Sequence, residues 1–599
     1  MVIATIYSDA EQEAILTDEL PRLLVTAPPG SGKTFTAVRL IERDINAGLV
    51  SPTQRVLILT FSRAARAQLD HYSRELLTAE QRSLTVISNY HSFFWQKIWQ
   101  FRQSLGLPLA LDLATDAQHR NDVLVAITRA GLTLPGNHQE NAMRDYAAAL
   151  EYTLDEGLPE RFGGQRPQSV AAVAAELEII HRAGRLHYDD MAAYMWHIVD
   201  GSRSIRELWT HKYPVVLLDE YQDASPLQAA IVERFSPPPH RVYAFADPLQ
   251  MIYGWRDASH KRLESFRSIG ASEHTLRTLH RYRNRSSLQL WMEQVRDVLL
   301  GERERVAVAR PTEVAVIRYD PSLPERGRVY GAPARELYQL SGPISGAFSD
   351  SEIGTIGVMT RRRNQIPVLT RALSQKFVCG LLGDADDAAD WVRDWIAAYA
   401  AATRPEHHAT RLLEVAQVVA PRHSLLADLR RLVCSTGIRT DRLREPRRSL
   451  AERINELIEH CDTLVGAIAA ARTTITLVIA DQDRKVVAWE RERVLRQALR
   501  ILPGSTDEEA RRQVDDRILQ LRFASAGMPQ RGLFLLSCHE GKGKEFDFVV
   551  LPFLSSENFE DDQESRQLLY VSLSRARQRI LVRLATGQIP AICERIGLV

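Results

Sequence analysis

Closely spaced cysteines are missing from this sequence. Its 599 residues contain five cysteines, which are scattered along the chain without a Cys-x-x-Cys pair. Zinc and iron–sulfur modules take their ligands from closely spaced cysteines, and disulfide frameworks need several of them. The cysteine usage therefore argues against these classes and suits a reducing cellular interior.

Long apolar runs and an excess of charge are missing too. No run of about 18 apolar residues is present, and the first residues lack the basic segment and apolar core of a secretory signal. We therefore expect a soluble, cytoplasmic protein with no membrane partner. Lysine and arginine total 76 against 75 aspartates and glutamates, a formal net charge of +1. Any surface for nucleic acid must therefore be a local patch.

What the sequence does contain, close to its start, is a phosphate-binding pattern, RLLVTAPPGSGKTFTAVR at residues 22–39. An apolar run at 23–25 predicts a strand, and the residues from 33 onward predict a helix. In the pattern Ala-x4-Gly-Lys-Thr, consecutive backbone N–H groups form an anion-binding nest at a helix N-terminus, and the lysine adds a positive charge. The nest residues are Gly30, Ser31, Gly32, Lys33 and Thr34.

A pair of carboxylates follows a later apolar strand. Asp219 and Glu220 come directly after the strand pattern at 213–218, in YPVVLLDEYQD. One carboxylate can hold the water shell of Mg²⁺ while the other orients or deprotonates an attacking water. Polar and aromatic residues also end the expected strand at 55–61 and the apolar run at 84–94, which closes on Tyr90, His91 and Ser92. Strand ends form the ligand crevice of an open α/β sheet. Together with the phosphate-binding pattern, the pair predicts a nucleotide-hydrolysing site.

Strand-like and helical blocks alternate along the chain, and their order predicts two α/β domains, each interrupted by a mainly helical insertion. The second insertion is rich in arginine. Such a run can bind phosphates, but a solvated helix face is the commoner explanation. The predicted limits are 1–95 with 209–274 for the first α/β domain, 96–208 for its insertion, 275–383 with 531–599 for the second domain, and 384–530 for its insertion.

Many ordered motifs then resemble one family, the UvrD/Rep/PcrA-like branch of superfamily 1 helicases. In chain order they are APPGSGKT, TFSRAA, YHSF, LLDEYQD, DPLQMIYGWR, RYRN, TRRRNQ, HEGKGKEF and YVSLSRA. The resemblance covers nearly the whole chain, and both helical insertions fall where that family carries its accessory subdomains. It implies an α/β fold of two RecA-like parallel-sheet domains, each with a helical insertion.

The resemblance also implies ATP as the nucleotide and Mg²⁺ as the cofactor. Lys33 would sit on the β- and γ-phosphates, Thr34 and Asp219 would hold the metal, and Glu220 would be the catalytic base. The remaining nucleotide residues that it implies are Gln250 as a γ-phosphate sensor, Arg283 and Arg575 as arginines reaching the γ-phosphate from the second domain, Tyr282 stacking on adenine, Glu545 near the ribose, and Gln12 near the base. Arginines supplied across a cleft would link hydrolysis to domain closure.

A second set of residues matches the family's DNA-binding positions. Phe61, Tyr253 and Trp255 match aromatic residues that stack on or pocket the bases of single-stranded DNA. Every base has a π-face, so such stacking tolerates any sequence. The residues that match contacts to the DNA backbone, or couplers of the ATP and DNA sites, are His91, Arg256, Arg361, Ser537 and His539.

The sequence departs from the family at the base-reading side of the nucleotide site and in the second insertion. The family's glutamine aligns with Glu11, which places Gln12 one residue late, and Phe35 stands where close relatives often have arginine. The second insertion keeps only a short echo, at 436–438, of a duplex-contacting glycine turn. We also expect no nuclease domain beyond the last strand, because the sequence stops at Val599.

Two functional hypotheses follow, with a third behind them. The leading one is an ATP-dependent translocase and helicase on single-stranded or partly duplex DNA, with 3′-to-5′ polarity by resemblance. The second is a DNA-stimulated ATPase sensor that regulates a nuclease or repair partner, similar to the helicase-like component of bacterial anti-phage systems such as Gabija. The third is an RNA translocase.

Overall fold

The computed structural model divides the chain into two compact units, Met1–Arg281 and Tyr282–Val599, and each is described by itself. It describes residues 9–61, 63–114, 116–131, 168–188, 190–252, 260–282, 284–320, 337–374, 376–381, 391–392, 395–396, 405–420, 424–441, 443–445, 447–480, 486–523 and 531–599. Every structural statement that follows concerns these residues.

The first unit contains a six-stranded sheet in the order β3-β2-β6-β7-β1-β8. Every neighbouring pair is parallel. The strands are β1 (Arg22–Thr26), β2 (Val56–Thr60), β3 (Thr85–Asn89), β6 (Val215–Leu218), β7 (Arg241–Ala246) and β8 (Ser272–Thr275). The central strands β1, β2, β6 and β7 are apolar apart from residues at their ends, which is typical of a parallel sheet covered by helices on both faces.

Helices α1, α2 and α3 pack on one face of this sheet. Val38 and Ile41 of α2 meet Leu23 and Val25 of β1 in a core without solvent exposure. Leu24, which lies between these two strand residues, is equally buried but faces the other side of the sheet. The helices around the sheet are α1 (Ala10–Thr17), α2 (Lys33–Asn46), α3 (Arg63–Leu76), α4 (Ala79–Ser83), α11 (Pro226–Phe235) and α12 (His260–Ser268).

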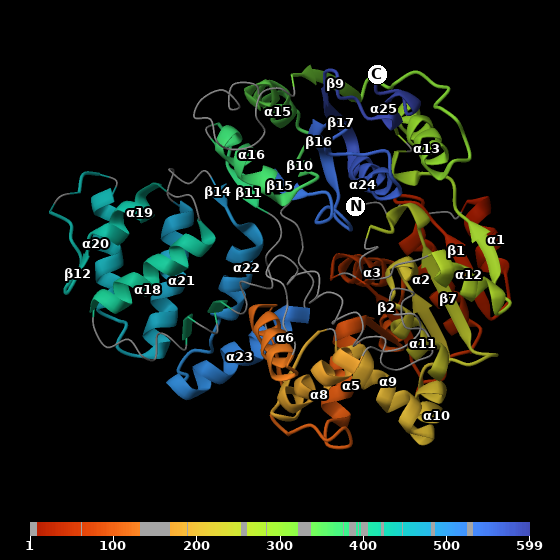
Figure 1. The fold of residues 1–599 in the computed structure, drawn as a ribbon, viewed down its shortest axis with the longest axis horizontal. Helices are drawn as coiled ribbons and strands as arrows, with labels where there is room; N and C mark the ends of the chain where they lie inside the picture. The colour runs from red at the N-terminus through yellow and green to blue at the C-terminus, as the bar shows by residue number, and fades with distance from the viewer. Residues whose placement is uncertain are drawn as a thin grey trace. The chain divides into compact units, whose positions relative to one another are not determined.

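A helical segment separates β3 from β6. Helix α9 packs against both α5 and α11, and α6 packs against α8 (Figure 1). The segment consists of α5 (Tyr90–Phe101), α6 (Asp116–Arg129), α8 (Gln168–Arg182), α9 (Asp190–Gly201) and α10 (Arg203–Lys212), with a small parallel pair of strands, β4 (Asp112–Leu113) and β5 (Arg185–Leu186). The sequence patterns did not predict this strand pair.

The second unit contains a seven-stranded sheet in the order β14-β11-β15-β10-β16-β17-β9, again with parallel neighbours. Its strands are β9 (Val314–Tyr319), β10 (Thr355–Thr360), β11 (Cys379–Leu381), β14 (Val486–Val487), β15 (Gly532–Ser537), β16 (Phe546–Leu554) and β17 (Ala576–Ala585). Its surrounding helices are α13 (Ser286–Leu300), α15 (Ser341–Phe348), α16 (Ile366–Leu373), α24 (Gln563–Leu573) and α25 (Ala591–Arg595).

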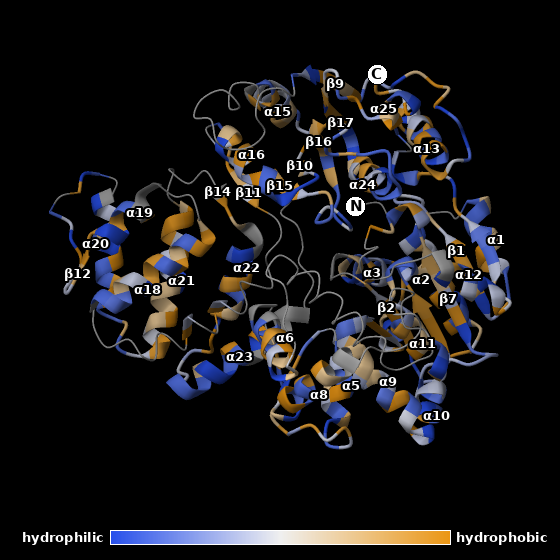
Figure 2. Cartoon of the chain, in the orientation of Figure 1, coloured by the Kyte–Doolittle hydropathy of each residue, from blue (hydrophilic) through white to orange (hydrophobic). Residues whose placement is uncertain are grey.

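A second helical segment lies between β11 and β15 in the chain and has its own apolar core. Helices α18, α20 and α21 pack against one another, and Figure 2 shows apolar residues concentrated along α21. The segment contains α18 (Pro405–Val419), α19 (Ser424–Arg431), α20 (Arg447–Ile458), α21 (Leu464–Ala480), α22 (Trp489–Ala498) and α23 (Asp507–Phe523), with the hairpin β12 (Val433–Cys434) and β13 (Gly437–Ile438).

The predicted fold class, two parallel-sheet domains with mainly helical insertions, is confirmed. The exact limits of domains and insertions stay predictions. In the arginine-rich run, Arg430 bonds to Gln417 and Glu414, and Arg448 pairs with Glu452, which are surface contacts of a solvated face. No helix among the described residues is both long enough and apolar enough to cross a membrane.

Candidate functional site

The loop between β1 and α2 has the backbone geometry of an anion nest. Gly30 and Gly32 have φ values of +85° and +84°, in the left-handed region that side chains disfavour. A Cβ on Gly30 would lie 2.6 Å from the Cβ of Arg281, so the loop also leaves no room for a side chain there. Gly32 is the N-cap of α2, and no side chain caps that helix end. The free N–H groups of the first turn therefore remain for a ligand.

Lys33, the first residue of α2, lies between the two predicted carboxylates. Its Nζ is 3.1 Å from Oδ1 of Asp219 and also contacts Oε1 of Glu220. Burial disfavours the charged ammonium, but the two carboxylates outweigh burial and raise the pKa of Lys33 above its usual range. The structure thus brings together three predicted residues from two strand ends.

A neighbouring strand holds the Asp219 carboxylate. Thr60, at the end of β2, donates its hydroxyl to Oδ2 of Asp219 at 3.1 Å. Burial raises the pKa of Asp219. The Lys33 ammonium lowers this pKa, and the adjacent Glu220 carboxylate raises it. Glu220 has a φ of +54°, and no other non-glycine residue in the described parts of the chain has a positive φ. Such strain persists only where the surroundings hold it, which is common at functional sites.

A buried polar network joins this strand end to the next. Gln250, which was predicted as a phosphate sensor, donates its amide to Oδ2 of Asp247 at 3.0 Å. The backbone N–H of Asp247 donates to Oε1 of Gln222 at 3.1 Å, and Gln222 donates its own amide to Oε2 of Glu220 at 2.6 Å. The chain of contacts therefore runs from Gln250 to Glu220. Asp247 and Gln222 were missed by the sequence analysis, although both stand inside motifs that it quoted.

Gln12 reaches the phosphate loop from α1. It forms a capping box with Asp9, is 3% exposed, and directs its side-chain Nε2 at the carbonyl of Ser31, 3.5 Å away. Its neighbour Glu11 turns elsewhere and accepts the backbone N–H groups of Arg277 and Thr278. The glutamine therefore lies beside the loop despite its one-residue displacement. Phe35 is 5% exposed and packs in the core rather than facing a ligand.

Four predicted nucleotide residues belong to the second unit, and the structure describes three of them. The Tyr282 ring is 1% exposed, and its hydroxyl donates to the carbonyl of Ala576. Arg575 is 4% exposed and donates from Nε to the carbonyl of Val571 at 3.0 Å. Glu545 accepts a contact from Nε of Arg577 at 3.1 Å. Arg283 lies outside the described residues.

Predicted DNA-binding residues gather at one strand edge of the second unit. Thr360 of β10 pairs in register with Ser537 of β15, so Arg361 and His539 follow adjacent strand ends. Arg361 lies 3.1 Å from Oε1 of Glu564, and His539 lies 3.9 Å from the same oxygen. Burial and the Arg361 guanidinium lower the pKa of His539.

The other described DNA-binding candidates belong to the first unit. Phe61 directly follows β2 and is half-buried. His91 lies in the first turn of α5, where its ring contacts that of Tyr188 edge-on at 5.6 Å. Tyr253, Trp255 and Arg256 lie outside the described residues.

A glycine nest, a lysine at the helix start and two carboxylates at a parallel strand end define a P-loop nucleotide-binding domain. Residues 8–269 match the family model described as UvrD/REP helicase N-terminal domain, and residues 532–582 match that of the UvrD-like helicase C-terminal domain. The chain belongs to the UvrD/REP helicase family.

The chain is similar to curated proteins named as DNA helicases and to one subunit of the RecBCD enzyme. The chain is 23% identical over 312 residues to the ATP-dependent DNA helicase PcrA of Leuconostoc citreum, covering 50% of this chain and 40% of that protein. It is 23% identical over 286 residues to DNA helicase II of Escherichia coli, covering 47% and 39%. It is 24% identical over 368 residues to the RecBCD enzyme subunit RecB of Mycolicibacterium smegmatis, covering 53% and 32%. The matched part thus spans about two fifths of the length of the PcrA and helicase II relatives.

Proposed function

We propose that this chain binds ATP with Mg²⁺ at the β1–α2 loop and hydrolyses it. One observation carries the proposal: Lys33 lies between the Asp219 and Glu220 carboxylates at the mouth of a glycine nest. These donors fit a triphosphate and its metal, because the nest and Lys33 offer N–H groups while Thr34 and Asp219 offer hard oxygen ligands. When bound, Mg²⁺ supplies charge neutralisation of the phosphates.

The residues of the site then divide the work. Lys33, which neutralises the carboxylates in the structure described, exchanges them for phosphate oxygens. Glu220 is released by that exchange and accepts a proton from the attacking water, while Gln250 and Gln222 keep the carboxylate oriented through hydrogen bonds. Arg283 and Arg575 stabilise the transition-state charge from the second domain.

We further propose that hydrolysis drives movement along single-stranded DNA and unwinding of partly duplex DNA, with 3′-to-5′ polarity. The family membership and the DNA helicase names of the relatives support this activity. Bases stack on Phe61, Tyr253 and Trp255. This stacking is independent of sequence because every base has a π-face. Duplexes carrying a single-stranded tail at either the 3′ or the 5′ end test the polarity.

The decisive experiment compares Lys33→Ala with the parent chain in a DNA-stimulated ATPase assay. We expect the variant to lose hydrolysis, since it removes the positive charge from the nest. Lys376→Ala is the matched control, because Lys376 is an exposed lysine of the second unit, and it should hydrolyse ATP at the parental rate. Hydrolysis that survives Lys33→Ala would contradict the site assignment.

A second candidate function is a DNA-stimulated ATPase sensor that regulates a nuclease or repair partner and unwinds little by itself. One relative favours it, because RecB is by its name a subunit of a larger enzyme. A forked DNA duplex discriminates the two functions. Strand displacement by the purified chain supports the helicase, whereas ATPase activity without displacement, restored by an added partner, supports the sensor. Matched RNA and DNA oligonucleotides in the same ATPase assay distinguish an RNA translocase.

A further inference from the structure

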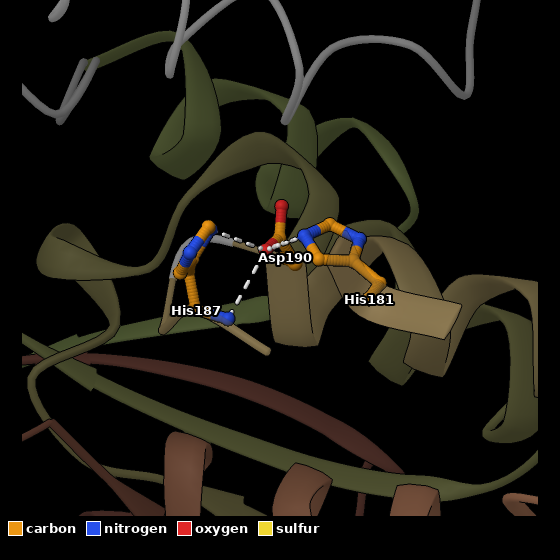
Figure 3. A group of neighbouring side chains, drawn as sticks. All are labelled: His181, His187 and Asp190. Atoms are coloured by element: carbon orange, nitrogen blue, oxygen red, sulfur yellow. Dashed lines mark hydrogen bonds and ion pairs between the residues drawn. The ribbon is translucent and has the colours of Figure 1, made fainter. Parts of the chain in front are cut away.

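Two histidines and an aspartate converge inside the helical segment of the first unit, apart from the phosphate loop (Figure 3). His181 lies at the end of α8, His187 directly follows β5, and Asp190 begins α9. One ligand atom from each lies within 4.8 Å of the others, and the three residues are 6%, 1% and 8% exposed. The cluster is thus a buried set of three potential metal ligands.

Both histidines form close ion-pair contacts with one oxygen of the aspartate. Nε2 of His181 and Nδ1 of His187 lie 2.8 and 3.1 Å from the same oxygen, Oδ2 of Asp190. That oxygen already accepts the backbone N–H of His187 at 3.1 Å. Neither ring nitrogen has a hydrogen-bond partner with correct direction among the described residues. One shared carboxylate oxygen satisfies two buried nitrogens poorly, so the arrangement suits a cation that both nitrogens and the carboxylate can bind.

The opposite nitrogen of each imidazole is already oriented. Nε2 of His187 lies 3.1 Å from Oδ2 of Asp122, which comes from α6 and is 3% exposed. Nδ1 of His181 lies 3.2 Å from the hydroxyl of Tyr194. Metal-binding histidines characteristically use their second nitrogen in this way, with a carboxylate or another oxygen fixing the tautomer and the ring. The surroundings of the cluster therefore match those of a metal site.

We propose that His181, His187 and Asp190 bind one divalent transition-metal ion, Zn²⁺ by the chemistry of the ligands. Two imidazoles and a carboxylate suit zinc, whereas magnesium and calcium prefer oxygen ligands throughout. The ion takes Nε2 of His181, Nδ1 of His187 and the Asp190 carboxylate, and a water completes its coordination. This site is separate from the nucleotide site and does not rest on the proposed ATPase activity.

The ion fastens the helical segment together. Its three ligands join the end of α8 to β5 and to the start of α9, and Asp122 adds α6. Helix α9 in turn packs against α5 and α11 beside the parallel sheet. Tyr188, the residue after one ligand, contacts the ring of His91. We therefore expect the metal to stabilise the segment that carries this predicted DNA-contacting histidine.

The test uses the full chain, purified without a histidine tag and dialysed against metal-free buffer. We expect elemental analysis to find about one zinc ion per chain after addition of Zn²⁺ and removal of the excess. Replacing it with Co²⁺ should give the visible absorption bands of a low-symmetry nitrogen- and oxygen-bound ion. Neither measurement depends on the folding of a variant. A chain that retains no zinc and gives no cobalt spectrum would show a metal-free ion-pair network and overturn the proposal.

Three variants sharpen the result. His187→Asn should abolish the cobalt spectrum and the rise in melting temperature that zinc gives the parent chain. His197→Asn is the matched control, because His197 is an exposed histidine of α9, and it should bind as the parent does. Asp122→Asn acts through His187, so it should keep the spectrum but weaken zinc affinity by about 10- to 100-fold. Unchanged zinc binding in a folded His187→Asn chain would refute the assignment.

Discussion

Exchange of Glu220 for glutamine should tighten ATP binding while it stops hydrolysis. In the structure the ammonium of Lys33 contacts Oε1 of Glu220 and lies 3.1 Å from Oδ1 of Asp219. An incoming phosphate must therefore compete with both carboxylates for the same lysine. Glu220→Gln keeps the shape of the side chain but removes one of the two competing charges. The phosphate then breaks a weaker contact when it binds Lys33.

The size of the effect follows from the burial of the pair. The Lys33 and Glu220 side chains are 13% and 16% exposed, so the contact is partly desolvated. A hydrogen bond between charged groups in such a place contributes about 1.5–3 kcal/mol, roughly twice the value for a neutral acceptor. The substitution therefore releases about 0.7–1.5 kcal/mol, which corresponds to roughly three- to tenfold tighter ATP binding. Loss of a general base should slow hydrolysis by about 10²- to 10⁴-fold.

Equilibrium titration with a fluorescent ATP analogue, without DNA, measures the affinity, and a phosphate-release assay measures turnover. Glu207→Gln is the control. Glu207 is an exposed residue that pairs with Arg203 on α10, away from the loop. The control should match the parent chain in both assays.

Two outcomes would count against this reasoning. Equal or weaker ATP binding by Glu220→Gln would mean that the carboxylate does not compete with phosphate for Lys33. Hydrolysis at the parental rate would remove Glu220 from its role as the base. Because affinity and turnover are measured separately, the two conclusions do not depend on each other.

Two further predictions concern single positions of the first unit. Gly30→Ala should weaken ATP binding at least tenfold by the same titration, whereas Gly48→Ala, at a φ of +74° with no atom within 4 Å of the added Cβ, should carry similar backbone strain and leave binding unchanged. Burial, and secondarily Lys212, lowers the pKa of Lys97 to about 8 from 10.5. Between pH 8 and 10.5 the unfolded chain holds a proton on Lys97 that the folded chain has lost, so the burial of this lysine destabilises the fold fully below pH 8 and no longer above pH 10.5. Lys97→Met should therefore raise the melting temperature most below pH 8, with a gain that fades toward pH 10.5. A gain that is constant with pH would refute burial of the charge as its cause.

The sequence could predict that Lys33 and Asp219 lie close together, because one rule of parallel sheets applies there. Lys33 follows β1 and Asp219 follows β6, and the carboxyl ends of parallel strands lie along one edge of the sheet. Apolar runs between polar ends were enough to identify both strands. The sequence also predicted the positions of Gly30 and Gly32, which have a positive φ, because they belong to the phosphate-binding pattern.

Other features left no comparable signal. Strand β8 reads SEHT, which lacks an apolar pattern because it is an edge strand paired on one side with β1. The predicted strand of the apolar run at 84–94, which closes on Tyr90, His91 and Ser92, ends at Asn89 in the structure, whose side chain caps α5 by accepting the N–H of Ser92 at 2.7 Å. A capping residue within an apolar run is hard to distinguish from a strand residue, so the boundary was placed too late.

The histidine cluster shows a different limit. His181, His187 and Asp190 are close in the sequence, but their spacing matches no established metal motif. The residue that orients His187 is Asp122, which belongs to a helix far earlier in the chain. The packing of α6 against α8 and the pairing of β4 with β5 bring the two together, and such contacts cannot be predicted from local sequence patterns.

The segment that follows β8 is bonded to the nucleotide site at several points. Glu11 of α1 accepts the N–H of Arg277, Asp9 lies 2.7 Å from Nε2 of His280, and the N–H of Arg281 donates to the carbonyl of Gly30 in the nest. Tyr282, the next residue, is where the second unit begins. The last residue before that boundary is therefore hydrogen bonded to the nest itself, through the carbonyl of Gly30. The Gly30 carbonyl thus connects the nest to the segment that leads along the chain into the second unit.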